Sequence, residues 1–305
     1  MDTSLIEKAA ALLRAGRLVA FPTETVYGLG ANALDAAAVG RIFEAKGRPK
    51  TSPLIVHVTS IEMARDLALE WPALAERLAR AFWPGPLTLV VRKRADIPDI
   101  VTAGLDTVGL RMPAHPVAME LLRATGLPVA APSANRFTEL SPVTAEHVRE
   151  SLGDAVDLIL DGGTCRVGIE STVLSVAGDV PVLLRPGIVS AGDLEALAGP
   201  VLRAGEAGNG AHASPGQHAR HYRPRKPLFL VDGELPAGRG AYLWWSQARE
   251  AAVVVEMPRS AVEYAARLYG TLHELDHRED VEWIAVERVP EEWEAVTDRL
   301  RRAAS

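Results

Sequence analysis

The chain has 305 residues, of which 48% are hydrophobic and 24% are charged. This composition is typical of a globular protein and excludes wholesale disorder, and the length favours two domains. The single cysteine, Cys165, excludes an intrachain disulfide framework or a cysteine-built zinc site. Because no N-terminal apolar run resembles a signal peptide or a membrane span, we expect a cytoplasmic protein without a membrane partner.

The net negative charge is confined to the C-terminal part of the chain. Lys and Arg number 24 against 24 Asp and Glu in residues 1–226, and 9 against 15 in residues 227–305, so the net charge of -6 arises in the latter. Phosphate contacts need a basic surface, so this part of the chain is a poor nucleic-acid-binding tail.

The first 204 residues contain both helix and strand patterns. Ser4–Ala15 has helical spacing, with Thr3 or Ser4 as its expected N-cap. The other predicted helices are residues 35–49, the two parts of 61–80, 115–126 and 144–153. The predicted strands are residues 17–23, 53–58, 87–93, 107–113, 127–133, 157–163, 171–178 and 180–187. Several strands follow each other without a helix, so we expect an α/β domain, 1–204, with a mixed sheet.

A linker and a smaller domain follow. Residues 205–226 lack hydrophobic periodicity and contain four glycines, two prolines and three histidines, as expected of a linker. Beyond it, strand patterns at 227–233, 240–246, 251–258 and 281–290 alternate with helical patterns at 261–277 and 291–304. This alternation predicts a small three-layer α/β domain over 227–305.

The segment FPTETVYGLG, residues 21–30, follows an apolar run and so lies at the carboxyl end of a predicted strand. Ligands of open α/β sheets bind beyond such ends. Thr23 and Thr25 can donate and accept hydrogen bonds, while Gly28 and Gly30 permit a close approach of the backbone. The alternative is an ordinary polar turn with a tyrosine packed beneath it.

Cationic side chains also gather at predicted strand edges. Lys46, Arg48 and Lys50 lie between a helix end and a buried strand, where cations can simply favour the helix dipole. Arg111 and Arg185 each end a further strand. Hydroxyl and amide side chains, at Ser133, Asn135, Ser171 and Thr172, occupy similar positions. Together they predict a pocket for an anionic ligand.

The absence of other motifs narrows the reaction class. The chain has no GxSxG, HExxH or Walker GxxxxGK[ST] pattern, so hydrolytic nucleophile and zinc chemistry lack support. Positioning and electrostatics remain, and these are the usual means of phosphoryl and nucleotidyl transfer.

Seven ordered blocks over about the first 190 residues resemble the threonylcarbamoyl-AMP synthase family of proteins with a YrdC-like domain. They are FPTETVYGLGANA, KGRPKTSPLIVHV, WPGPLTLVV, VGLRMPAHP, APSANRF, GIESTVL and LLRPG. The later segment SPGQHARHYRP resembles the family's long form, which has an additional C-terminal domain. The resemblance implies a YrdC-like twisted mixed sheet with flanking helices, and a Rossmann-like C-terminal domain.

The activity implied by this resemblance is an ATP-dependent synthesis. L-Threonine, bicarbonate and ATP would give threonylcarbamoyl-adenylate and pyrophosphate, assisted by Mg²⁺ carried mainly by the ATP phosphates. The product would pass to a tRNA threonylcarbamoyl transferase machinery, which modifies the adenosine beside the anticodon. A weak contact with RNA is a further implication.

The resemblance also implies roles for individual residues of the site. Lys46 and Arg48 would be catalytic by offsetting the triphosphate charge. The residues facing ATP would be Arg48, Ser52, Thr107, Ser133, Asn135, Ser141, Arg185 and Tyr222. The residues holding threonine would be Thr25, His57, Arg111, Ala131 through its backbone, and Ser171. The linker 205–226 would fold over the pocket as a lid or serve only as a tether. The chain departs from the family pattern at Thr51–Ser52 and at Phe137–Thr138, where a small Ser-Gly pair is usual.

Two alternatives compete with the synthase. An RNA-binding module with a basic concave surface is weakened by the zero net charge of residues 1–226 and by few aromatic residues beside the basic ones. A relative that transfers a carbamoyl group from carbamoyl phosphate would carry zinc-finger and acylphosphatase-like segments, for which this chain has neither the cysteine pairs nor the length.

Overall fold

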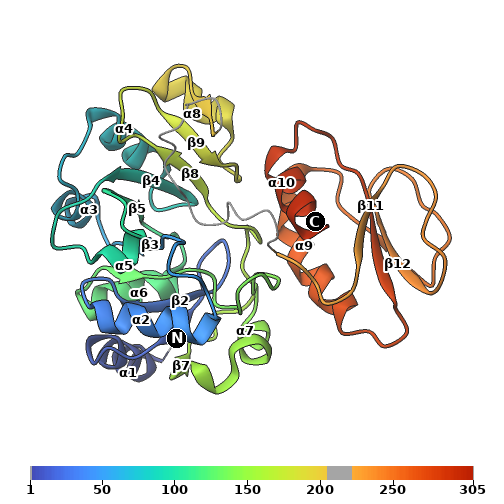
Figure 1. The fold of residues 1–305 in the computed structure, drawn as a ribbon, viewed down its shortest axis with the longest axis horizontal. Coiled ribbons are helices and arrows are strands. Elements are labelled where there is room, and N and C mark those ends of the chain that lie inside the picture. Colours follow the sequence, from blue (N-terminus) through green and yellow to red (C-terminus); the bar gives the residue numbers. More distant parts are fainter. Residues whose placement is uncertain (1, 205–221, 305) are drawn as a thin grey trace.

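Two α/β domains lie side by side in the computed structural model, which describes residues 2–204 and 222–304 (Figure 1). The N-terminal domain contains a 10-stranded sheet and the C-terminal domain a 4-stranded sheet. The helices of the first domain are α1 (Thr3–Arg14), α2 (Ala36–Lys46), α3 (Ile61–Leu67), α4 (Ala73–Phe82), α5 (Asp99–Thr102), α6 (Pro116–Thr125), α7 (Ala145–Leu152) and α8 (Ala191–Ala198). None of the helices in the described ranges has the length and apolarity needed to cross a membrane.

The large sheet is mixed, as the sequence predicted. Its strands run in the order β10-β9-β8-β4-β5-β3-β6-β2-β1-β7, with parallel pairs β10–β9, β8–β4, β5–β3 and β1–β7 among antiparallel neighbours. The strands are β1 (Val19–Phe21), β2 (Gly28–Asn32), β3 (Ile55–His57), β4 (Leu87–Arg92), β5 (Thr107–Arg111), β6 (Val129–Ala130), β7 (Leu158–Ile159), β8 (Thr172–Ser175), β9 (Val182–Arg185) and β10 (Leu202–Arg203).

Helix ends follow their local sequence. Asp35 caps α2 by accepting hydrogen bonds from the amides of Ala37 and Ala38, and Gly47 ends that helix at a left-handed φ of 60°. The N-cap of α1 is Asp2, whose carboxylate accepts from the amide of Ser4, so the expected cap at Thr3 or Ser4 was wrong by one or two positions. Asp2 is the N-cap because its side-chain oxygen reaches the first unpaired amides of the helix.

Four short strands and α-helices were not predicted. Gly28–Asn32 forms strand β2, although we had placed its glycines in a loop. Helices α5 and α8 and strand β10 were also missed, because segments of 2 to 8 residues carry little periodicity. Strand β10 pairs with β9, and α8 packs near α4, so residues 191–203 extend the first domain rather than begin the second.

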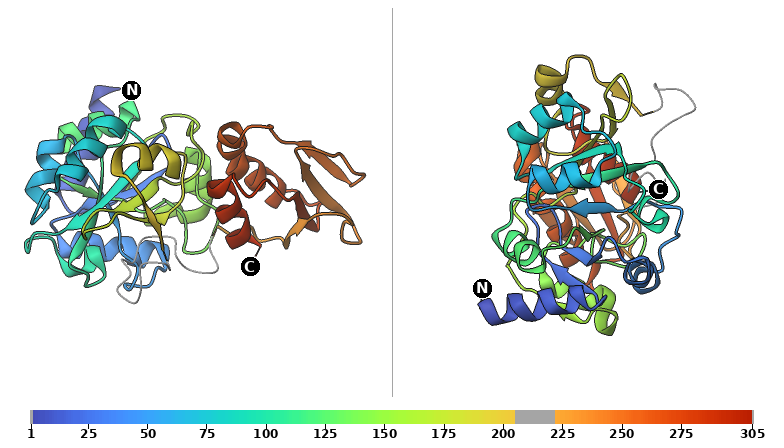
Figure 2. Two further views of the ribbon diagram at one scale, coloured as in Figure 1. Left: turned by 90° about the horizontal axis from the view of Figure 1, so that it is seen from above. Right: turned by 90° about the vertical axis from the view of Figure 1, so that its left-hand side faces the viewer.

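The C-terminal sheet is entirely parallel, in the order β11-β14-β12-β13. Its elements are β11 (Leu228–Val231), β12 (Gly240–Trp244), β13 (Val253–Glu256), α9 (Ala261–Asp276), β14 (Trp283–Glu287) and α10 (Glu294–Ala303). Both helices lie between this sheet and the N-terminal domain (Figure 2). The opposite face packs Tyr242, Trp283 and Ala285 against loop residues such as Leu235. The third layer of the expected arrangement is therefore formed by loops rather than by helices.

Helix α9 packs directly on the N-terminal domain. Gly168 has a φ of 75°, and a side chain there would lie 2.6 Å from the backbone of α9, so only glycine allows this approach. The stacked rings of His147 and His273, with centroids 3.7 Å apart, also join the domains. Most of the predicted linker lies outside the described residues, but Tyr222 at its end is buried between the domains.

Candidate functional site

The segment between β1 and β2 is a structured turn that presents Thr25 to a pocket. The Thr23 hydroxyl bonds with that of Thr25 at 2.8 Å and donates to the carbonyl of Val26 at 2.6 Å. Tyr27 is buried beneath the turn, and its hydroxyl donates to the carbonyl of Gly163 at 2.8 Å. The tyrosine therefore anchors the turn to the chain after β7, while the threonines shape its tip.

The two glycines of this segment have different uses. A side chain on Gly30 would lie 2.8 Å from Phe21 and 3.0 Å from Val129, so this glycine allows sheet packing and not ligand approach. Gly28 lines the pocket, where the nearest side chain is that of Ala131. Of the two glycines, only Gly28 lies at the pocket.

Nine of the predicted site residues line one pocket at the ends of strands from the N-terminal domain. They are Thr25, Arg48, His57, Arg111, Ala131, Ser133, Ser171, Arg185 and Tyr222. The remaining lining residues are Thr23, Val26, Gly28, Ile55, Pro132 and Glu170. These side chains come from segments up to more than 190 positions apart in the sequence. Folding therefore brings residues that are distant in the sequence into one pocket.

Arg111 joins the turn to the sheet. Its guanidinium forms an ion pair with Glu24 at 2.7 Å and donates to the Thr25 hydroxyl at 3.0 Å and to the carbonyl of Gly85 at 3.2 Å. Both members of the ion pair are buried, at 4% and 5% side-chain exposure. The Glu24 carboxylate also accepts from the amide of Ala114. The lining cation Arg111 is therefore paired with an anion, Glu24, that lies outside the lining.

His57 lies beside Arg111, because β3 and β5 pair in parallel with these two residues in register. Burial, followed by the charge of Arg111, lowers the pKa of His57 to about 3. The imidazole is neutral at physiological pH, and we therefore assign it no proton transfer.

Three lowered histidine pKa values predict an acid-sensitive fold. Burial lowers the pKa of His57 to about 3, of His147 to about 4 and of His273 to about 3. The unfolded chain, with histidine pKa values near 6.5, binds more protons than the folded chain below that pH, so stability falls as the pH decreases. Each histidine contributes at most about 2 kcal/mol between pH 7 and pH 5. Urea unfolding at both values measures this loss.

The control for that prediction is the double variant His147→Phe/His273→Phe. It keeps two stacked rings at the domain interface and removes two titrating groups, so its stability should depend less on pH. A variant with the same pH dependence as the natural chain would contradict the assignment.

Arg48, in the segment after α2, lines the same pocket. Its guanidinium donates to the Ser52 hydroxyl at 2.7 Å and to the carbonyl of Pro53 at 3.2 Å, and it lies 5.9 Å from the centre of the Phe137 ring. Burial lowers its pKa to about 10, which leaves it charged at neutral pH. Ser52, predicted to face ATP, thus orients Arg48 instead of lining the pocket.

The departure at Phe137–Thr138 lies in a loop beside Arg48. Thr138 has a φ of 74°, a left-handed conformation that a glycine would adopt without strain. The amide of Phe137 donates to the carbonyl of Lys46 at 2.8 Å. The loop thus has a left-handed residue at Thr138, and the Phe137 ring packs beside Arg48.

Arg185 and Ser171 form a third part of the pocket. Arg185 donates to the carbonyl of Ser171 at 3.0 Å and to its hydroxyl at 3.1 Å. The Ser171 hydroxyl also bonds with that of Thr88 at 2.8 Å. Burial lowers the pKa of Arg185. Ser171, predicted to hold threonine, therefore links the cationic side of the pocket to β4.

Lys46 does not line the pocket. Its ammonium is buried and donates to the backbone carbonyls of Ser133 and Asn135. Burial, and then the charge of Arg48, hold the pKa of Lys46 well below its usual value. Both carbonyls belong to the turn at 132–136. The placement of Lys46 therefore favours a role in supporting this turn over the predicted catalytic contact with phosphate.

Three other predicted ATP contacts lie outside the lining. Asn135 turns into its own loop and donates to the carbonyls of Arg136 and Glu139. Ser141 donates to Glu170 at 2.5 Å. Thr107, at the start of β5, lines a separate hollow with Thr88 and Val173. Sequence order alone could not separate these residues from the lining, because each lies within a few positions of it.

Sequence reasoning missed two acidic residues and a basic one. Glu24 and Glu170 lie within quoted segments, yet neither received a role, since acidic side chains conflict with a pocket for an anion. Arg299, in α10, forms an ion pair with Glu170 at 2.7 Å and is fully buried. Its position in a helix rich in charged residues resembles that of a solvated side chain, so no pattern distinguished it.

The fold and the pocket define an α/β protein with an arginine-lined pocket in its N-terminal domain, and the second domain contacts the lining residue Glu170 through Arg299. A family model described as telomere recombination matches residues 11–187, and one described as threonylcarbamoyl-AMP synthase, C-terminal domain, matches residues 189–305. The chain belongs to the threonylcarbamoyl-AMP synthase family.

Similar proteins extend over the whole chain. It is 43% identical to the threonylcarbamoyl-AMP synthase of Pyrococcus abyssi, covering 98% of this chain and 94% of that protein. It is 42% identical to the threonylcarbamoyl-AMP synthase of Bacillus subtilis, covering 98% and 92%. The crystal structure of P. abyssi Sua5 complexed with L-threonine aligns with a TM-score of 0.92 at 41% identity, covering 100% of this chain and 95% of that one. The predicted family and fold are confirmed.

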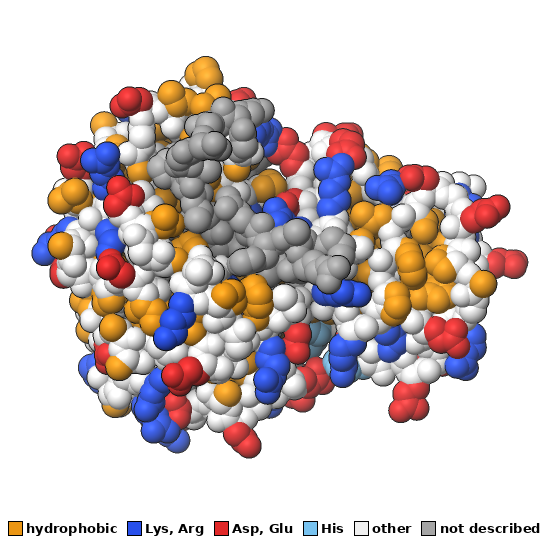
Figure 3. All heavy atoms as spheres, viewed as in Figure 1, with side chains coloured by type: hydrophobic (Ala, Val, Ile, Leu, Met, Phe, Trp, Pro, Cys, Tyr) orange, Lys and Arg blue, Asp and Glu red, His pale blue; other side chains and the backbone are white. Residues whose placement is uncertain are grey.

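The RNA-binding alternative is not favoured. Arg48, Arg111 and Arg185 are 4–7% exposed and point into the pocket, so they do not form an accessible basic surface. On the face drawn in Figure 3, basic side chains are interspersed with acidic ones. A protein that binds RNA without catalysis needs a continuous basic groove.

Proposed function

We propose that this protein is an L-threonylcarbamoyladenylate synthase, a nucleotidyltransferase that makes threonylcarbamoyl-AMP and pyrophosphate from L-threonine, bicarbonate and ATP. The observation that carries the proposal is the division of charge within one pocket. The charge of Arg111 is balanced by Glu24, which lies outside the lining, and this suits a zwitterionic amino acid. Arg48 and Arg185 also line the pocket, and their charges suit a polyphosphate.

The threonine end is assigned from its hydrogen-bonding groups. Arg111 pairs with the substrate carboxylate, and the Thr25 hydroxyl, 3.0 Å from Arg111, binds beside it. The amide of Ala131 already donates to the carbonyl of Ile55, so we assign the carbonyl of Ala131 to the substrate amine. Neutral His57 and Ser171 complete this subsite. The similar P. abyssi protein has been crystallised with L-threonine, which supports threonine as the ligand.

The ATP side is assigned from charge. Arg48 and Arg185 offset the negative charge of the phosphates, while Ser133 and Tyr222 shape the wall beside them. Ser52 supports Arg48, and Lys46, Asn135 and Ser141 support the surrounding loops. Within residues 2–204 and 222–304 no group of three or more His, Cys, Asp or Glu side chains could hold a metal ion. We propose that Mg²⁺ is carried mainly by the ATP phosphates.

The reaction consists of two bond exchanges. The threonine amine attacks bicarbonate, water leaves, and a carbamate forms. A carbamate oxygen then attacks the α-phosphorus of ATP, and the bond to the bridging oxygen breaks to release pyrophosphate. The pocket contributes proximity and charge compensation, with no covalent intermediate on the protein.

The product is a mixed anhydride that must pass to an acceptor before water destroys it. We propose that a tRNA threonylcarbamoyl transferase machinery in the cytoplasm receives it, with the adenosine beside the anticodon as the final acceptor. Any contact of this protein with RNA is then weak and incidental to synthesis.

Pyrophosphate release tests the proposed function. The purified chain is incubated with ATP and Mg²⁺, and L-threonine and bicarbonate are added or omitted one at a time. Release that requires both substrates is expected. Release independent of threonine, or none from a folded protein, would overturn the proposal.

A further inference from the structure

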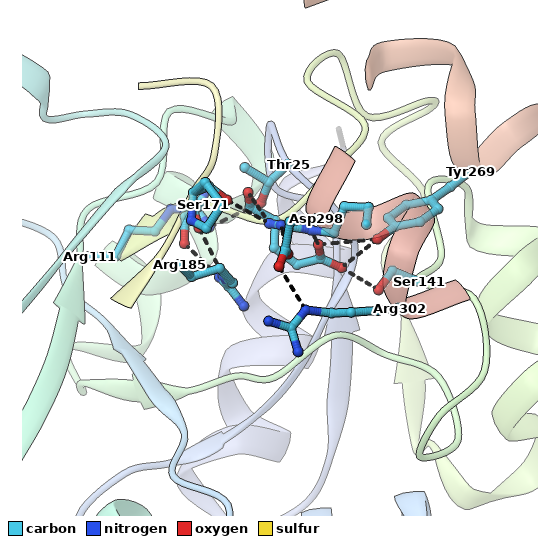
Figure 4. A network of polar contacts seen from close by, with 11 residues as sticks. Thr25, Arg111, Ser141, Ser171, Arg185, Tyr269, Asp298 and Arg302 are labelled. Carbon is cyan, nitrogen blue, oxygen red and sulfur yellow. Dashed lines mark hydrogen bonds and ion pairs between the residues drawn. The ribbon is translucent and has the colours of Figure 1, made fainter. Parts of the chain in front are cut away.

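Glu170 is the acidic residue of the pocket wall, and its partners come from both domains. Its carboxylate accepts from the Ser141 hydroxyl at 2.5 Å, from Arg299 at 2.7 Å and from the Tyr269 hydroxyl at 3.3 Å. Tyr269 belongs to α9 and Arg299 to α10. Figure 4 shows this network lying beside Ser171 and Arg185. Residues of the C-terminal domain thus determine how an acidic group of the pocket is held.

Arg299 contacts three separate parts of that wall. Besides the Glu170 carboxylate, it donates to the backbone carbonyl of Pro186 at 3.1 Å, next to Arg185. Its guanidinium carbon lies 5.4 Å from the centre of the Tyr222 ring. Asp298 accepts from it at 2.6 Å and also pairs with Arg302. One buried guanidinium therefore connects the loop at 170, the end of β9 and the end of the linker.

The charge of Arg299 keeps Glu170 ionised and balances its negative charge. Burial raises the pKa of Glu170, but the charges of Arg299 and then Arg185 outweigh burial and lower it to about 2, so the carboxylate is ionised. A buried carboxylate that loses its cation attracts the next nearest one. The other cation whose charge acts on Glu170 is Arg185, which donates to Ser171, the residue after Glu170 in the chain, and lines the pocket.

We propose that Arg299 is a positioning residue of the active site: by neutralising Glu170 from the C-terminal domain, it keeps Arg185 directed at Ser171 and the anionic ligand. The C-terminal domain thereby completes the site and does more than tether the linker. This inference rests on the proposed function for the identity of the ligand as ATP.

Four variants of the full chain test the proposal. Arg299→Met removes the charge from a fully buried side chain, and Glu170→Gln removes the carboxylate. The double variant Glu170→Gln/Arg299→Met removes both. The matched control is Arg301→Met, the same change in the same helix at a side chain that is 57% exposed and paired with Glu291. Calorimetric Kd values for ATP with Mg²⁺ and for L-threonine are measured, together with the thermal unfolding midpoint.

We expect Arg299→Met to weaken ATP binding by about tenfold, the loss typical of a hydrogen bond to a charged group, and threonine binding by less than about threefold. Arg301→Met should match the natural chain. The double variant should bind ATP more tightly than Arg299→Met, because no unpaired carboxylate remains to attract Arg185. A purely structural contact would instead give a double variant no better than the single one, and that outcome would overturn the proposal.

Two further comparisons keep the test decisive. If Arg299→Met does not fold, Arg299→Lys is compared with the double variant. Arg299→Lys should bind ATP at least as tightly as the double variant, because it retains the positive charge beside Glu170. Failure of pyrophosphate release by the natural chain would refute the proposed function, whereas the order of ATP affinities among the variants would still decide the role of Arg299. Equal ATP affinity in all variants would overturn the inference alone.

Discussion

Arg111→Met is expected to lower kcat/KM for L-threonine by about 100-fold, because Arg111 supplies the charged hydrogen bonds to the substrate carboxylate. ATP binding should change by less than about threefold, since Arg48 and Arg185 are untouched. The substitution also leaves Glu24 buried without its cation, which typically costs about 3–5 kcal/mol of stability. Steady-state kinetics, ATP calorimetry and urea unfolding separate these effects.

The double variant Glu24→Gln/Arg111→Met is the control. It removes the uncompensated carboxylate, so stability should recover, while threonine binding should remain weak. Recovery of both would show that Arg111 acts only by holding the turn. Equal losses of threonine and ATP binding in the folded variant would show that the pocket is not divided as we propose.

Lys46→Met is expected to reduce turnover and stability together. Methionine fills a similar volume, but the carbonyls of Ser133 and Asn135 then lose a buried donor, at about 1–3 kcal/mol for each unsatisfied group. The turn at 132–136 carries Pro132 and Ser133 into the pocket, and a displacement of about 1 Å in such a turn can cost about 100-fold in rate. The unfolding midpoint and kcat/KM are measured on the same preparation.

Lys50→Met provides the matched comparison, because Lys50 belongs to the same basic segment but is exposed. It should leave both quantities unchanged. Turnover lost at full stability in Lys46→Met would instead restore the direct contact with phosphate that the sequence suggested for this lysine. The comparison therefore separates a catalytic cation from one that supports a loop.

These two residues illustrate how far sequence reasoning reaches. Arg111 was predicted from its position at a strand end, and the fold places it in the pocket because β5 ends there beside β3. Lys46 and Arg48 were treated alike, since both are cations in KGRPK. The helix end at Gly47 separates them, so that Lys46 points under a loop while Arg48 lines the pocket.

The sequence by itself determined the family, the mixed α/β character and nine of the residues that line the pocket, because ordered motifs and hydrophobic runs are local properties of the chain. Only the tertiary structure decided how the charges are paired. Glu24 offsets Arg111, and Arg299 offsets Glu170 from 129 positions away. Such pairing depends on which buried side chains come into contact in a medium of low dielectric constant. Contacts between residues far apart in the sequence cannot be inferred from a local sequence pattern.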